Sequence, residues 1–270
     1  MNVIDFCESI LLKGSLEDKF LSPDVVTDYE YKTSTVPSLP VRDKSLSICD
    51  QRQKFPKIGN FQNENVRGQA LHFFANHELL AIEMMAAAII KCGNQRPSEF
   101  KKIAQGILHA IKEEQKHLRL YINRMNDFGV EFGDYPLNNF FWRQLADIDS
   151  FDDFFATMSL TFEAANLDFA AFYQRVFSEI GDQKTANILK IVYEDELTHV
   201  KLGSFWLNKW REKDDLWSYY VAHLPEGITP ARSKGIAYQE SHRKKAGLAP
   251  EFIHQLTHFK DDFAITRRKN

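Results

Sequence analysis

The amino-acid sequence predicts an all-α protein built around a four-helix bundle with a long crossover between its second and third helices. Long stretches place apolar residues at intervals of three and four, which is the period of a helix with one buried face. Two of these stretches contain the same Glu-x-x-His pattern. A segment of about twenty residues without helical periodicity separates the two pairs of helices, as a crossover connection would.

The first 64 residues are expected to form an N-terminal helix and an extended arm. The opening sequence MNVIDFCESILLKG has the pattern of a short amphipathic helix, and it is acidic where a secretory signal would be basic. Residues 34–60 contain several prolines and serines, which favour an extended segment with local turns.

Residues 65–213 are expected to form the bundle as two helical hairpins. In the first hairpin, one helix should run from about Asn65 to Lys91, because the glycine and proline of the following CGNQRP segment end a helix. Its partner should stop at Gly129.

The second hairpin follows the crossover at residues 129–150. Its first helix should begin near Phe151, and a tight turn at residues 179–183 should connect it to an antiparallel neighbour. Residues 214–270 then change to short helical pieces separated by prolines, and we expect a C-terminal helical extension packed on the bundle.

Glu196 and His199 lie three residues apart, so they project from the same face of a helix. That face is otherwise apolar. A single Glu-x-x-His is more often a surface pair, but Glu114 and His117 repeat it in an equally apolar stripe with matching flanks. This repetition indicates an internal duplication.

The duplication extends to the preceding helices. HELLAIE at 77–83 aligns with FEAANLD at 162–168, which pairs Glu78 with Glu163. The same alignment pairs Glu83 with Asp168, but these acids lie about 140° further round the helix, where structural ion pairing is the expected role. Each helix of the bundle therefore places one carboxylate on its apolar face.

One Glu from each of two helices and Glu-x-x-His from each of two others form the ligand set of ferritin-like, carboxylate-bridged dimetal bundles. Four carboxylates in a low-dielectric core would repel one another, and two divalent ions would neutralise them. Oxygen-rich sites with imidazole suit two iron ions or a manganese/iron pair. We expect Glu114 and Glu196 to bridge the metals, and the other ligands to be terminal. The six predicted metal ligands are Glu78, Glu114, His117, Glu163, Glu196 and His199.

Residues near these ligands have two interpretations each. Glu113 and Asp195 either accept an imidazole N–H and fix its orientation or belong to a solvated face. Tyr193, one turn before Glu196, is a candidate catalytic tyrosine, although this is the less favoured interpretation. Gly203 stands where the first repeat has Tyr121, and it either opens a substrate pocket beside His199 or permits close helix contact. His72 and His77 are expected to pack or to form hydrogen bonds, not to bind metal.

Composition is consistent with a cytoplasmic protein. The chain has 270 residues, of which 44% are hydrophobic and 26% are charged. No apolar run approaches the ~18 residues of a membrane span. Three cysteines without metal-type spacing favour a reducing compartment. The net charge of −3 gives no general case for nucleic-acid binding.

The motifs resemble those of a ferritin-like family called domain-of-unknown-function family 455. The resemblance is carried by HELLAIEMMA, EEQKHLRLY, GDYPLNNFFW, LTFEAANLDFA and EDELTHVKLG, and extends weakly to LLKGSLEDKF and RKKAGLAPEF. It implies the fold and the metal site but no substrate. One departure is Glu113, where members commonly have Asp.

The leading functional hypothesis is a diiron oxidase or monooxygenase that uses O₂ to oxidise a small organic substrate and needs an external electron donor. The first alternative is a ferroxidase or iron-handling protein; a monomer or homodimer in gel filtration would favour the enzyme, and a shell of many subunits would favour storage. The second is a tRNA-modifying hydroxylase, supported only by the basic clusters HRKK at 242–245 and RRK at 267–269, which a solvated helix end explains equally well.

Overall fold

The computed structural model describes residues 1–49 and 54–261, and within them the regular structure is entirely helical. The predicted all-α class is therefore confirmed for this part of the chain. The chain divides into two compact units, Met1–Ala146 and Asp147–Asn270, and each is described by itself. The predicted division at residues 64 and 213 stays a prediction. The basic cluster at 267–269 lies outside the described residues.

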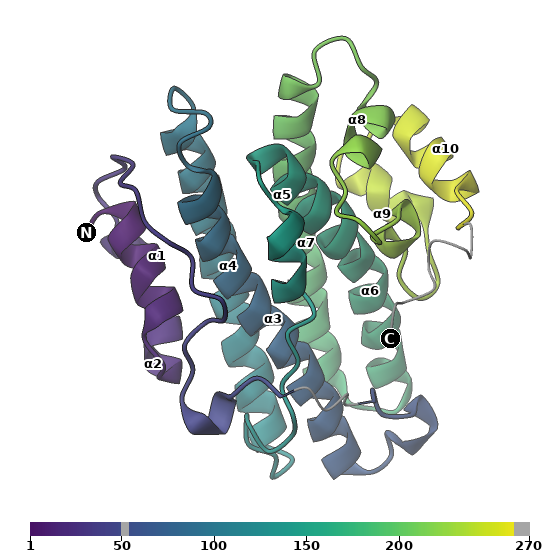
Figure 1. Cartoon of the computed structure of the whole chain (residues 1–270). Coiled ribbons are helices and arrows are strands. Elements are labelled where there is room, and N and C mark those ends of the chain that lie inside the picture. Colours follow the sequence, from purple (N-terminus) through teal and green to yellow (C-terminus); the bar gives the residue numbers. More distant parts are fainter. Residues whose placement is uncertain (50–53, 262–270) are drawn as a thin grey trace. The chain divides into compact units, whose positions relative to one another are not determined.

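The first unit is built on a hairpin of two long helices, α3 (Glu64–Cys92) and α4 (Phe100–Asn126), which lie side by side (Figure 1). The side chain of Asn63 accepts a hydrogen bond from the Asn65 N–H and so caps α3. Both helices begin and end close to the residues predicted from the sequence.

Helix α3 is apolar on nearly every face. Among the described residues, α3 is the one helix whose length and composition would allow it to cross a membrane. However, 83% of its most apolar stretch of 18 residues is buried inside the protein, as in a core helix of a soluble protein.

The N-terminal arm contacts both helices of this hairpin through short elements. Helix α1 (Val3–Leu12) packs against α3. The predicted short N-terminal helix is present. The other elements of the arm are α2 (Leu16–Lys19), η1 (Pro23–Val25), η2 (Lys44–Leu46) and η3 (Ile58–Asn60).

Glu83 of α3 anchors this arm through a buried ionic cluster. Its carboxylate lies 3.2 Å from the Lys19 ammonium and accepts hydrogen bonds from Arg42 Nε at 3.0 Å and Nη2 at 2.6 Å. Lys19 also donates to the carbonyls of Ile10 and Val41. The structural ion pairing predicted for Glu83 is confirmed.

The second unit is built on a helical hairpin, and the first half of this hairpin consists of three consecutive helical segments. These are α5 (Phe151–Thr157), a π-helix labelled η5 (Met158–Glu163), and α6 (Ala164–Glu179); they pack along α7 (Gln183–Trp210) (Figure 1). Ser150 caps α5 and Asp182 caps α7. The short 3₁₀ helix η4 (Trp142–Asp147) lies in the connection before α5.

Residues after α7 form the short helices that the sequence predicts for this region. They are α8 (Leu216–Ala222), η6 (Pro230–Ser233), α9 (Glu240–Lys245) and α10 (Pro250–His258). Helix α9 packs against α6 and α10.

Asp168 of α6 anchors this extension, as Glu83 anchors the arm. Its Oδ1 accepts from Arg243 Nη1 at 2.5 Å and lies 3.0 Å from His242 Nδ1. The N–H of Gly235 donates to its Oδ2 at 3.0 Å. The pairing role predicted for Asp168 is confirmed, and two residues of the HRKK cluster, His242 and Arg243, are buried.

Candidate metal centre

The first unit brings together Glu78 of α3 with Glu114 and His117 of α4. All three are buried, with exposed fractions of 4%, 1% and 0%. Each offers one ligand atom, and these atoms lie within 4.8 Å of one another. His117 Nδ1 is 3.4 Å from Glu114 Oε2. We call these residues the first triad.

The second unit repeats this arrangement with Glu163, at the end of the π-helix, and Glu196 and His199 of α7. Their exposed fractions are 4%, 1% and 2%, and one ligand atom from each lies within 4.8 Å of the others. His199 Nδ1 is 3.3 Å from Glu196 Oε2 and 3.9 Å from Glu163 Oε1. We call these residues the second triad.

The chemistry of the donors fits a metal ion. Each triad places two carboxylates and one imidazole in a buried position, where an ionised carboxylate is costly unless a cation compensates its charge. A divalent cation supplies that charge and accepts oxygen and nitrogen ligands together. The buried carboxylate and histidine groups of both triads could therefore hold a metal ion.

The local sequence explains why the ligands converge within each unit. Glu-x-x-His places its two side chains on one face of a helix, one turn apart. The hairpin then packs that face against the helix that carries the remaining glutamate. The apolar stripes on either side bury the three side chains together.

A family described as "Protein of unknown function (DUF455)" matches residues 7–254. The chain belongs to this family. All six triad residues fall inside the matched range.

An uncharacterized protein of Haemophilus influenzae is 25% identical to the chain over 162 residues. The match covers 58% of this chain and 56% of that relative, so the chain spans a little over half of the relative's length. No solved structure matches.

Asn166 contributes to the second triad in this DUF455 member, and sequence reasoning assigned it no role. Its side-chain amide donates from Nδ2 to Glu196 Oε1 at 2.8 Å. The sequence feature that could have pointed to Asn166 is its polar amide within the apolar stripe of its helix, between Leu160 and Leu167.

The π-helix was also missed. It runs from Met158 to Glu163, so its last residue is a predicted ligand. Such segments occur often at functional sites. Apolar periodicity could not reveal it, because the pattern of buried residues continues through it almost unbroken.

Tyr193, Glu113 and Asp195 are all half-buried. The Tyr193 ring packs against the His242 ring, with centroids 5.2 Å apart. Glu113 Oε1 is 3.6 Å from His109 Nε2, and the backbone carbonyl of Asp195 accepts from Thr198 Oγ1 at 2.8 Å. Their predicted roles beside the metal stay predictions.

The packing roles predicted for His72 and His77 are confirmed. His72 Nε2 accepts a hydrogen bond from the Gly133 N–H at 3.0 Å, and burial lowers the pKa of His72 to about 4. His77 packs edge-on to Phe73 and stacks on Phe141. Burial likewise lowers the pKa of His77 to about 4.

The pocket interpretation of Gly203 is wrong. A Cβ atom placed on Gly203 would lie 2.2 Å from Ser159 Cβ and 2.8 Å from Ser159 Oγ. The π-helix thus occupies the space that a larger side chain would take. The alternative interpretation, a glycine that permits close helix contact, is confirmed.

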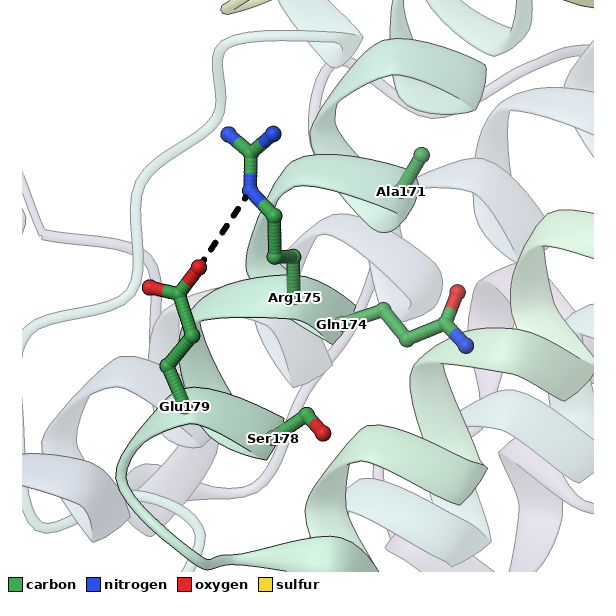
Figure 2. Close-up of a pocket in the computed structure, with 5 residues that line it drawn as sticks. All are labelled: Ala171, Gln174, Arg175, Ser178 and Glu179. Atoms are coloured by element: carbon green, nitrogen blue, oxygen red, sulfur yellow. Dashed lines mark ion pairs between the residues drawn. The ribbon is translucent and has the colours of Figure 1, made fainter.

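A surface depression lies elsewhere, on α6. Figure 2 shows that its lining side chains all project from this one helix, and Arg175 Nε lies 3.8 Å from Glu179 Oε1. It contains none of the six triad residues, so we assign it no role in the candidate metal centre. The lining residues are Ala171, Gln174, Arg175, Ser178 and Glu179.

Proposed function

We propose that this chain is a ferritin-like dimetal protein in which the two triads together hold two metal ions within a four-helix bundle. The observation that supports it is the repetition of one buried donor set, Glu plus Glu-x-x-His, in both units. Two divalent ions would balance the charge of four buried carboxylates.

We further propose that the metal is iron and that the protein uses O₂ to oxidise a small organic substrate. When bound, a reduced carboxylate-bridged diiron pair supplies two electrons to O₂, and an external donor must restore them. Carboxylate and imidazole donors suit iron, and a manganese/iron pair has the same ligand preference.

Each ligand has a role that follows from its position. Glu114 and Glu196, each one turn from a histidine on its helix, are the proposed bridging carboxylates. Glu78 and Glu163 would hold the metals as terminal ligands, as would the two imidazoles, whose Nδ1 atoms lie 3.4 Å from Glu114 Oε2 and 3.3 Å from Glu196 Oε2. Burial of the ligands excludes bulk water and strengthens their electrostatic interactions.

The proposal is tested by metal analysis of protein purified without chelators, together with O₂ consumption after reduction. We expect about two metal ions per chain and O₂ uptake by the reduced protein. His199→Ala should lower the metal content, whereas His109→Ala should not, because the His109 side chain is 69% exposed. Protein that is metal-free, folded and indifferent to added Fe²⁺ would contradict the proposal.

The same preparation separates the enzyme from the iron-handling alternative. Iron deposition in a shell of many subunits, seen by gel filtration, would favour storage. For the RNA-modification alternative, His242 and Arg243 of the HRKK cluster are buried against Asp168, and Lys244 and Lys245 are its exposed cations.

A further inference from the structure

A side-chain amide holds one carboxylate of the second triad. In the second triad, Asn166 Nδ2 donates to Glu196 Oε1 at 2.8 Å, while Glu196 Oε2 lies 3.3 Å from His199 Nδ1. The amide therefore holds one carboxylate oxygen and leaves the other on the imidazole side. Hydrogen bonds of this kind fix the orientation of a metal-binding carboxylate.

The first triad has no such amide at the equivalent position. Asn166 follows Glu163 by three residues, and the residue three after Glu78 is Ala81. Its methyl side chain cannot donate a hydrogen bond to Glu114.

Glu163 is also held by its own segment. Two residues earlier in the π-helix, Thr161 Oγ1 donates to the Ala156 carbonyl at 2.9 Å and lies 2.8 Å from Tyr220 Oη. Tyr220 Oη in turn lies 2.6 Å from Ser233 Oγ. Thr161, Tyr220 and Ser233 are each 0% exposed. This buried hydroxyl chain fixes the helical turn that ends in Glu163.

We infer that the second triad is preorganised and takes up metal first, with Asn166 as the residue that positions Glu196. This inference rests on the proposed function. A carboxylate already oriented before the metal arrives loses less conformational entropy on binding. Removing an outer hydrogen-bond partner of a metal ligand typically costs about 10- to 100-fold in metal affinity.

The test is titration of the metal-free protein with Co²⁺, followed by optical absorption. Two binding steps are expected. His199→Ala should abolish the tighter step, and His117→Ala should leave it. Asn166→Ala should weaken the tighter step by about 10-fold or more and the weaker step by less.

Three further variants control for indirect effects. Asn187→Ala removes an exposed amide from α7 and should leave both steps unchanged. Ala81→Asn places an amide at the equivalent position of the first hairpin and should narrow the difference between the steps. Tyr220→Phe, which shortens the hydroxyl chain, should weaken the tighter step if Asn166→Ala proves too unstable to titrate. Thermal unfolding of each metal-free variant reports whether it folds.

The outcomes separate the two proposals. The inference would be overturned if His117→Ala and His199→Ala weakened the tighter step equally. It would also be overturned if Asn166→Ala bound Co²⁺ as the wild type does. Neither result would contradict the proposed dimetal centre. Absence of Co²⁺ binding by the wild type would overturn the proposed function itself.

Discussion

The two helical hairpins of this chain carry the same set of possible metal donors, one Glu and one Glu-x-x-His, but pack their helices differently. In the first, Phe74 and Tyr121 fill the space between α3 and α4, with ring centroids 5.6 Å apart. In the second, the equivalent positions are Ser159 and Gly203, where α7 approaches the π-helix closely. The two hairpins thus share the donor set but differ beside it, where the first has two aromatic rings and the second has a glycine against Ser159.

The hairpins agree in a second respect. Glu83 and Asp168 occupy equivalent positions, and each is buried with cations from the extension of its own unit. Both hairpins therefore have a buried carboxylate that anchors the N-terminal arm or the C-terminal extension, as well as a set of possible metal donors.

The largest expected effect comes from removing these shared anchors. Glu83→Ala should lower the free energy of unfolding by about 3–5 kcal/mol, because it leaves buried cations without a partner. Burial lowers the pKa of Lys19, and the Glu83 carboxylate opposes that shift, so its loss leaves the ammonium uncompensated. Asp168→Ala should be comparably costly, since Arg243 is 0% exposed. Urea unfolding measures both variants.

Glu194→Ala is the matched control for the anchors. The Glu194 side chain is 58% exposed, and its Oε1 lies 3.9 Å from Lys190 Nζ, so its removal should change stability little. If the two anchor variants were no less stable than this control, the buried clusters would not be the anchors that we describe.

Helical spacing within a single element was enough to predict the ligand pairs. A carboxylate three residues from a histidine must share its face, and apolar neighbours indicate that this face is buried, so the groupings of Glu114 with His117 and of Glu196 with His199 were predictable. The Asn166 hydrogen bond was not, because its acceptor Glu196 lies thirty residues away on another helix.

The close contact at Gly203 could not be predicted from its own helix either. An absent side chain leaves either a cavity or a close contact, and the choice depends on Ser159, which belongs to a different segment. Within the π-helix, the Thr161 hydroxyl contacts that of Tyr220, which lies 59 residues further along the chain. The features that the sequence did not predict therefore involve contacts between different helices, whereas the predicted Glu-x-x-His pairs lie within one helix.

The difference between the hairpins at Gly203 predicts an intermediate effect. Gly203→Ala should lower the free energy of unfolding by about 1–3 kcal/mol, because the new methyl group overlaps Ser159 Cβ in a packed interior. Adding Ser159→Gly removes that overlap. The double variant should therefore be more stable than the sum of the two single effects, which a double-mutant cycle measures.

Gly59→Ala is the control, since a Cβ at Gly59 meets nothing within 4 Å. Equal effects of alanine at Gly59 and Gly203, or strict additivity with Ser159→Gly, would contradict the close contact.

The smallest effect that we predict concerns pH and the first hairpin. His72 and His77 precede Glu78, whereas the equivalent positions in the second hairpin are Thr157 and Phe162. Burial lowers the pKa of His72 from 6.5 to about 4, so between these values the unfolded chain binds a proton that the folded chain does not. Stability from this residue is complete above pH 6.5 and is lost as the pH falls towards 4. The test compares the wild type with His72→Gln, which retains a hydrogen-bond acceptor without a titrating ring.

On lowering the pH by about one unit from 6.5, the free energy of unfolding of the wild type should fall by about 1 kcal/mol more than that of the variant. Urea unfolding at both pH values measures the difference, and parallel pH profiles would show that His72 does not enter the folded state as a neutral acceptor.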